Sequence, residues 1–269
     1  MRKLLIAVAA VAALIAAGCA PEVAATEEDT PAKATTQKPA DAAADPEEPK
    51  ADPALREYTD AAASFDPVAM RETAKDLTVP GSVAEAYLLH LANNSEAALD
   101  GGTMYPEYGA PTAKDGGLQY CASDIDGAKA CTIWGNFKTS EGKITDLTVD
   151  GKEIGPRLTL GGNTTVQSGG ATWEFLSAYR SIQSEALWVV VKVTTTNAID
   201  VFSYEAKYRA PDGKQRTAAQ ADGPTELAAD STAMIAFAFP GAQPGGSVTV
   251  EGCANDCMSD YTATINVGK

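Results

Sequence analysis

The second half of the chain is a run of short β patterns separated by turn signals, and no helical pattern interrupts it. The segment 187–191 is entirely apolar, which predicts a strand buried on both faces. In 172–179, Trp173, Phe175 and Tyr179 alternate with polar neighbours. Seven or eight short strands with turns between them are typical of a β-sandwich. The further predicted strands are 186–194, 201–208 (with Phe202, Tyr204, Ala206 and Tyr208 on one face), 233–239, 247–251 and 261–267.

The preceding region begins with helical patterns. Segment 68–77 predicts a short helix, and Ser82 followed by Glu85 forms a capping box that starts a second helix ending near residue 99. We expect that helix to pack on an antiparallel sheet formed by segments 118–121, 130–138 and 143–149, with short strands at 152–154 and 158–160. One stripe of the helix carries apolar residues at helical spacing, namely Ala84, Tyr87, Leu88, Leu91, Ala98 and Leu99.

The first 64 residues have a different composition. Two basic residues precede the apolar run 4–17, which is too short to span a bilayer. This pattern is typical of a secretory signal. Residues 20–64 are rich in Ala, Pro, Glu and Thr, and no large apolar residue lies between Val23 and Leu55. A segment of this kind cannot bury enough surface to fold. We therefore predict a disordered tether over 19–64.

These patterns divide the chain into four parts. We predict a signal peptide over 1–18, the tether over 19–64, a helix-plus-β-hairpin module over 65–157, and a sandwich over 158–269. The predicted fold class is thus α+β followed by all-β. A chain of this length is long enough for two small domains after the tether.

The stretch from Leu14 to Cys19 resembles a bacterial lipobox. Ala17-Gly18-Cys19 matches the motif well, whereas Ala16 stands where the family usually has leucine. The resemblance implies cleavage before Cys19 and acylation of its sulfur, with palmitate-like chains, and hence anchoring at the extracellular face of the cell membrane. Two acyl chains suffice for stable anchoring. An ordinary cleaved signal peptide and an uncleaved anchor are the alternatives.

Lipidation of Cys19 would leave four of the five cysteines. An oxidising compartment favours two disulfides among Cys121, Cys131, Cys253 and Cys257. Three pairings are open, and proximity in sequence suggests Cys121–Cys131 and Cys253–Cys257. The alternative is a structural zinc site, which lacks a C-x-x-C pair and has the single histidine, His90, far away in sequence.

Two further resemblances concern the folded part. The phrase Cys131-Thr132-Ile133-Trp134, with the segment 142–152, is similar to an element of actinobacterial exported lipoproteins, covering roughly residues 82–160. Trp173-Glu174-Phe175, 187–193, Asn197, Tyr204 and Pro211-Asp212-Gly213 resemble the immunoglobulin-like domain of Gram-positive immunoprotective extracellular proteins, covering about 162–269. This second resemblance implies an immunoglobulin-like sandwich. Neither resemblance carries a catalytic motif.

The composition excludes several functions. A formal net charge of −15 argues against binding nucleic acid, whose phosphates need basic patches. His90 is the only histidine and is expected at the flank of the apolar stripe, half exposed, where its replacement by Ala would change stability by about 1 kcal/mol or less. There is no G-x-S-x-G elbow. Segment 124–127 fails the calcium-loop pattern because Gly135 stands where an acidic residue is needed. We expect no catalytic residue, cofactor or resident metal.

Tyr105 and Tyr108, on either side of Pro106-Glu107, form the best candidate binding loop, and a loop packed over the core is the alternative. The prediction that follows is a lipid-anchored, non-catalytic binding module of the cell envelope, with an envelope protein or a small ligand as its partner. The alternatives are an extracellular hydrolase that uses carboxylates, and a structural spacer without a dedicated ligand. Two carboxylates converging in a cleft would favour the hydrolase.

Overall fold

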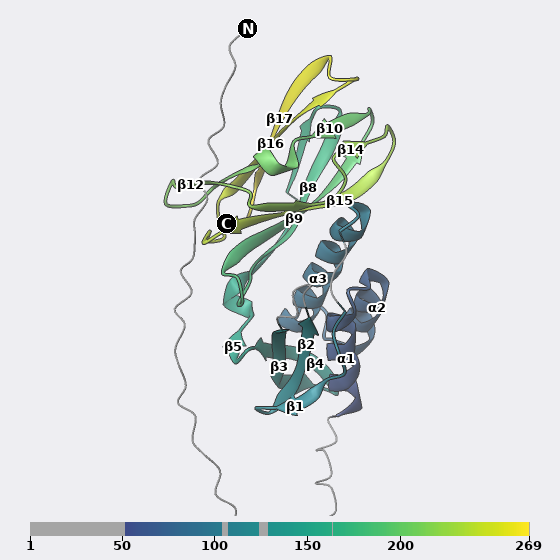
Figure 1. The fold of residues 1–269 in the computed structure, drawn as a ribbon, viewed down its shortest axis with the longest axis vertical. Coiled ribbons are helices and arrows are strands. Elements are labelled where there is room, and N and C mark those ends of the chain that lie inside the picture. Colours follow the sequence, from purple (N-terminus) through teal and green to yellow (C-terminus); the bar gives the residue numbers. More distant parts are fainter. Residues whose placement is uncertain (1–51, 104–106, 124–128, 163, 269) are drawn as a thin grey trace, which may run out of the picture. The chain divides into compact units, whose positions relative to one another are not determined.

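The computed structural model describes residues 52–103, 107–123, 129–162 and 164–268, and these belong to one compact unit. Three helices come first and antiparallel sheets follow (Figure 1). The helices are α1 (Pro53–Ser64), α2 (Pro67–Leu77) and α3 (Val83–Asp100). Each begins at a polar cap: the side chains of Asp52, Asp66 and Ser82 accept hydrogen bonds from first-turn backbone N–H groups. The predicted helices at 68–77 and 82–99 are therefore confirmed.

The predicted tether is wrong at its C-terminal end, because residues 53–64 form α1. Tyr58 on this helix is fully buried, and its hydroxyl donates to the carbonyl of Ala84 at 2.9 Å. Pro53 at the first helical position and the Asp52 cap start the helix. Most apolar residues of α1 are alanines, so the composition of residues 53–64 is like that of a disordered segment. Residues 1–51, including Cys19, lie outside the described part of the chain.

A five-stranded antiparallel sheet in the order β1-β2-β3-β4-β5 lies beside the helices. Its core with α1, α2 and α3 includes Tyr87, Leu88, Trp134 and Leu147. The helix-plus-hairpin arrangement predicted for this region is thus present. The strands are β1 (Thr112–Lys114), β2 (Gly117–Ser123), β3 (Lys129–Ser140), β4 (Lys143–Val149) and β5 (Lys152–Glu153), followed by the 3₁₀ turn η1 (Gly155–Arg157).

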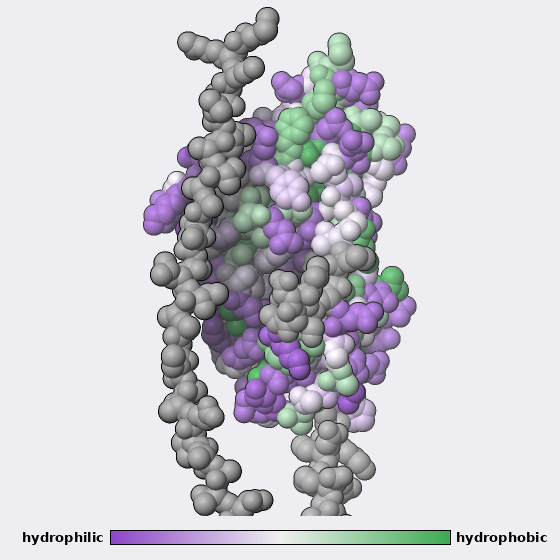
Figure 2. All heavy atoms as spheres, viewed as in Figure 1, coloured by the Kyte–Doolittle hydropathy of each residue, from purple (hydrophilic) through white to green (hydrophobic). Residues whose placement is uncertain are grey.

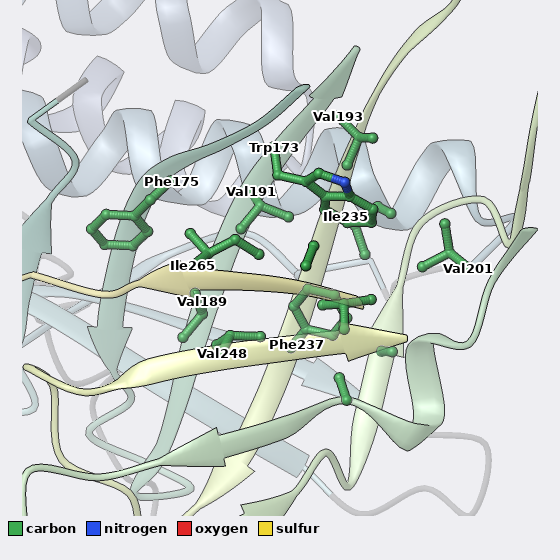
Figure 3. Packing of buried hydrophobic residues seen from close by; sticks show 14 of the residues in the cluster. Trp173, Phe175, Val189, Val191, Val193, Val201, Ile235, Phe237, Val248 and Ile265 are labelled. Carbon is green, nitrogen blue, oxygen red and sulfur yellow. The ribbon is translucent and has the colours of Figure 1, made fainter. Parts of the chain in front are cut away.

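Two six-stranded antiparallel sheets make up the rest and share one core, which Figure 3 shows around Trp173 and Phe237. This mostly antiparallel β architecture is consistent with the predicted sandwich. In the first sheet, β13, β15, β9, β8 and β6 follow in order and β7 pairs with β8. Its strands are β6 (Leu158–Leu160), β7 (Thr165–Ser168), β8 (Ala171–Arg180), β9 (Ala186–Thr195), β13 (Gln220–Asp222) and β15 (Thr232–Pro240).

In the second sheet β16 pairs with β17 along one edge and with both β10 and β11 along the other. Beyond these, β12 pairs with β11 and β14 pairs with β10. The segment 201–208, predicted as one strand, is instead broken by the 3₁₀ turn η2 (Ser203–Glu205), so Phe202 and Tyr204 are exposed while Ala206 and Tyr208 are buried. The strands are β10 (Ile199–Val201), β11 (Lys207–Arg209), β12 (Gln215–Thr217), β14 (Glu226–Leu227), β16 (Ser247–Ala254) and β17 (Ser259–Asn266).

The first sandwich sheet is covered on its other face by α3. The strand β9 is buried on both faces as predicted: Val189, Val191 and Val193 join the sandwich core, while Val190 contacts Ala97 of α3. A β-bulge in β8 between Phe175 and Ser177 reverses the alternation that the sequence predicted. Trp173 and Phe175 therefore face the sandwich core, whereas Tyr179 joins the helical core.

The two proximity pairs of cysteines lie at bonding distance. Cys121 and Cys131 face each other across β2 and β3, with Cα atoms 4.0 Å apart. Cys253 at the end of β16 is joined to Cys257 in the following turn, with Cα atoms 4.7 Å apart. The predicted pairing by proximity is confirmed, and neither bridge joins the two sandwich sheets.

The buried role of α1 leads to a testable expectation. Tyr58→Ala should lower the free energy of unfolding by about 3–5 kcal/mol, because it empties a large buried site and removes the hydrogen bond to Ala84. Glu57→Ala, at the exposed neighbouring position, should change it by less than about 0.5 kcal/mol. Urea melts of both variants measure the difference. Equal effects would contradict the placement of α1 in the core.

Candidate functional site: an acidic cleft at the end of helix α3

A cleft of about 390 Å³ opens where the C-terminal end of α3 meets the sandwich. One wall is formed by Asp100 and Gly101 at the end of the helix and by Thr103 after it. The other wall is formed by η2 and by the loop between β13 and β14. Residues separated by more than 100 positions in sequence therefore meet at this site.

The two walls touch through two glycines. A side-chain Cβ atom on Gly101 would lie 2.7 Å from the backbone nitrogen of Gly223, and Gly223 itself has a φ of 123°. Only glycine fits such a close approach, and only glycine readily adopts that backbone conformation. The end of α3 is thus fixed against the β13–β14 loop, and this contact sets the spacing of the cleft walls.

Three carboxylates line the cleft. Asp222 is 4% exposed; Thr103 Oγ1 donates to its Oδ1 at 3.0 Å and Gln220 Nε2 to its Oδ2 at 3.1 Å. Asp100 and Glu226 are exposed to solvent. Although exposed, Asp100 is partly shielded from water, and this partial burial together with the charge of Glu96 raises the pKa of its carboxyl above the usual range. None of the ion pairs formed between described residues includes Asp100, Asp222 or Glu226.

The helix adds to the negative potential. The C-terminus of an α-helix carries roughly half a negative elementary charge, which basic residues in the last turn usually offset. The last turn of α3 has no basic residue and ends instead on Asp100. The arrangement concentrates negative charge in a cleft walled by protein, where a positive group is attracted more strongly than at an open surface.

Two further residues line the cleft, Ser203 and Tyr204. Ser203 lines it and is 3% exposed, and its hydroxyl oxygen has no hydrogen-bond partner among the described residues. A buried hydroxyl without a partner is uncommon and calls for an explanation. The neighbouring Tyr204 is 63% exposed and also lines the cleft. A tyrosine ring attracts cations through its negative face.

The predicted binding loop is only partly described. Tyr108 is half buried; its ring stacks on Phe65 with centroids 5.5 Å apart and meets the edge of Trp134 at 6.2 Å. It therefore takes part in the aromatic packing over the five-stranded sheet. Tyr105 lies outside the described residues, as does the segment 124–127, and the binding role of this loop stays a prediction.

The expectation for His90 is wrong. Its side chain is 2% exposed, and its Nδ1 lies 2.8 Å from the hydroxyl of Ser177 on β8. Burial lowers the pKa of this imidazole from 6.5 to about 3. The β8 bulge turns Ser177 toward α3 and so brings a serine to the histidine, but both are sealed inside the packing between α3 and the sheet. The pair links the helix to the sandwich and has no access for a substrate.

None of the cleft residues was predicted from the sequence as a site residue. Asp100, Ser203 and Asp222 carry no motif, and the chain has 36 acidic residues from which to choose. The available signals were the absence of a basic residue before Gly101-Gly102 and the two aromatic residues that flank Ser203, Phe202 and Tyr204. Within the described residues, one group could also hold a metal ion: Asp200, Cys253 and Cys257.

Comparisons with known proteins add no assignment. No protein-family model matches the chain, and searches of curated proteins and of solved structures found no match. No helix within the described residues combines the length and the apolar character that crossing a bilayer requires. On the face seen in Figure 2, hydrophilic residues are interspersed with hydrophobic ones.

The buried histidine gives a pH-dependent prediction. Between pH 6.5 and about 3 the unfolded chain binds a proton at His90 that the folded protein does not. The contribution of neutral His90 to the free energy of unfolding is therefore fully present above pH 6.5. As the pH falls from 6.5 to about 3, this contribution decreases by up to about 1.4 kcal/mol per pH unit. We expect the stability advantage of the wild type over His90→Gln, measured by urea melts, to shrink steadily from pH 7 to pH 4.

The difference in stability between the wild type and His90→Gln cancels the pH dependence that comes from the carboxylates, because the carboxylates titrate in both proteins. A difference that does not vary with pH would show that the imidazole titrates normally in the folded protein. His90→Ala should cost about 2–4 kcal/mol at pH 7, because it leaves a cavity and an unpaired Ser177 hydroxyl.

Proposed function

We propose that this protein is a non-catalytic binding module of the cell envelope that recognises a positively charged group in the acidic cleft. The observation that carries the proposal is the combination of unpaired carboxylates with the partnerless Ser203 hydroxyl in one cleft. An ammonium group supplies both a positive charge for Asp100 and Glu226 and N–H donors for oxygen acceptors. Tyr204 adds a ring face at the rim.

The volume of the cleft limits the ligand. At about 390 Å³ it accommodates a side chain or a small molecule rather than a polymer. The positive group can be presented by an envelope protein, as a lysine side chain, or by a free small amine. Both sources share the same chemistry, and the experiment below separates them.

A second candidate is a carboxylate-dependent hydrolase. It is favoured by one observation: the same cleft contains a buried carboxylate, Asp222, and an acid with a raised pKa, Asp100. Such a pair can divide the roles of base and acid. We rank it second because Asp222 already accepts hydrogen bonds from Thr103 and Gln220. A loss of glycoside- or ester-hydrolysing activity in Asp222→Asn would put it first.

The cellular setting belongs to the same proposal. We infer that the chain is an exported lipoprotein, resembling those of actinobacteria and other Gram-positive bacteria, whose signal peptide is cleaved before Cys19. The acylated cysteine would hold the folded unit at the extracellular face of the membrane through the segment before α1. The sandwich would be immunoglobulin-like, which its antiparallel sheets and shared core support.

Binding can be measured with the probes ethanolamine hydrochloride and a short lysine-rich peptide, by calorimetry at low and at high salt. We expect saturable binding that weakens with salt, because screening reduces the attraction of exposed charges. Glu226→Gln and Asp100→Asn should each weaken it by about three- to tenfold. Preference for the peptide would indicate a protein partner, and preference for ethanolamine a small ligand.

The control variant is Asp115→Asn, which removes an exposed charge from the β1–β2 turn in the five-stranded sheet. It makes the net charge less negative by the same amount as Glu226→Gln does and should leave the affinity unchanged. If the control weakens binding as much as the cleft variants do, the attraction comes from the overall charge of −15, and the cleft is not the site.

Anchoring is tested at the lipobox. Cys19→Ser should block acylation, so that the protein accumulates unprocessed or is released into the medium. Partitioning between detergent and aqueous phases, with mass spectrometry of the N-terminus, measures the outcome. Normal processing and continued detergent partitioning of the variant would contradict the lipoprotein assignment.

A further inference from the structure

A carboxylate lies directly over the second disulfide. Asp200 on β10 pairs with Cys253 of β16 on one side and with Glu226 of β14 on the other. Its Oδ2 lies 3.1 Å from Cys257 Sγ and 3.5 Å from Cys253 Sγ. All potential ligand atoms of Asp200, Cys253 and Cys257 lie within 4.8 Å of one another.

We propose that reduction of the Cys253–Cys257 disulfide converts this group into a binding site for a thiophilic divalent cation such as Zn²⁺. Two thiolates and the Asp200 carboxylate would be the ligands. The site borders the acidic cleft at Glu226, and the inference does not depend on the amine-binding role proposed for that cleft.

The distances already fit a tetrahedral site. Zinc binds thiolate sulfur at about 2.3 Å and carboxylate oxygen at about 2.0–2.2 Å, so a sulfur and an oxygen ligand of the same ion lie roughly 3.5 Å apart. The two sulfur-to-oxygen distances of 3.1 and 3.5 Å are close to this value. Only the two sulfurs need to move apart, to roughly 3.8 Å.

The surroundings allow that movement. Cys253 is 1% exposed and fixed at the end of β16, whereas Cys257 is exposed in the turn. Asn255, Asp256 and Cys257 are consecutive non-glycine residues with φ near +55°, a conformation that is unfavourable for cysteine. Opening the ring would free Cys257 to take a new rotamer while Cys253 and Asp200 stay in place.

Next to Asp200 and Cys253 there is space for a further metal ligand, and carboxylate oxygen atoms are present to serve as one. A pocket of about 400 Å³ is lined by Asp200 and Cys253 together with the carboxylates of Glu226 and Asp256. A fourth ligand can be one of these carboxylates or a water molecule. Zinc sites with three protein ligands commonly keep a water in the fourth position.

The chemistry balances with an external dithiol as reductant. A dithiol thiolate attacks the exposed sulfur of Cys257, and the disulfide bond breaks with Cys253 as leaving group. The second thiol of the reductant then attacks the reductant's own sulfur in this mixed disulfide and releases Cys257 as a thiolate. The oxidised reductant leaves as a cyclic disulfide. Two electrons and two protons have passed to the protein. Binding of the divalent cation afterwards releases the two thiol protons.

The other disulfide provides an internal comparison. Cys121 and Cys131 lie opposite each other in the ladder of β2 and β3, which continues on both sides of them. Among the described residues, no group of three possible metal ligands includes either of them. We therefore expect cation binding at the Cys253–Cys257 pair and not at this one.

The test uses the full chain with Cys19→Ser, which removes the fifth thiol, reduced by a dithiol that is then removed without air. The probe is Co²⁺, whose near-ultraviolet charge-transfer absorption reports thiolate ligands, and Zn²⁺ is added as competitor. We expect one equivalent of Co²⁺ to give this absorption and one equivalent of Zn²⁺ to abolish it. The oxidised protein should give none.

Three variants locate the site. Cys121→Ser/Cys131→Ser should keep the absorption, and Cys253→Ser/Cys257→Ser should lose it. Asp200→Asn should weaken cation affinity at least tenfold, since even outer partners of metal ligands contribute that much. Circular dichroism of each reduced protein checks that it remains folded.

Several results would overturn the proposal. These are no absorption in the reduced protein, absorption that survives Cys253→Ser/Cys257→Ser, unchanged affinity in Asp200→Asn, and unfolding of the protein on reduction. Zinc protection of Cys253 and Cys257 against alkylation, mapped by mass spectrometry, gives an independent readout that does not use cobalt.

Discussion

The packing of α3 between two different sheets is the constraint on which the rest of the structure depends. One side of the helix presents Tyr87 and Leu88 to the core of the five-stranded sheet. The other side presents His90 and Ala97 to the first sandwich sheet. The small residue Ala97 packs in one buried cluster with Val190, and a hydrogen bond between His90 and Ser177 links the helix to the sheet.

The position of α3 also determines where charge accumulates. Its C-terminal end meets the β13–β14 loop through Gly101 and Gly223, so the last carboxylate of the helix, Asp100, is brought toward Asp222 and Glu226. Glu226 lines a second pocket as well, together with Asp200 and Cys253. One end of the sandwich therefore carries neighbouring acidic pockets, one beside a partnerless serine hydroxyl and one beside a disulfide.

The local patterns predicted the elements well where a single physical signal decided them. The capping residue Ser82 and the turn signals around β4 placed α3 and the strand 143–149 correctly. The prediction was wrong where tertiary packing decided. The bulge in β8 places the Tyr179 side chain on the opposite face of the sheet from the one predicted. The helix α1 folds although its composition is like that of a tether, because Tyr58 fills a site in the core. No acidic residue of the cleft stood out, since local sequence does not reveal which carboxylates converge.

The sequence alone determined the β-rich second half and the capped helices, because these depend on periodicity and on capping groups. It only suggested the disulfide pairing, which the structure decided. It also determined the net negative charge, which bears on the kind of ligand. Only the tertiary structure decided that His90 is buried, that Asp100 shares a cleft with Asp222, and that Asp200 lies over Cys253 and Cys257. Each of these depends on contacts between residues more than 50 positions apart, which packing creates and no local pattern encodes.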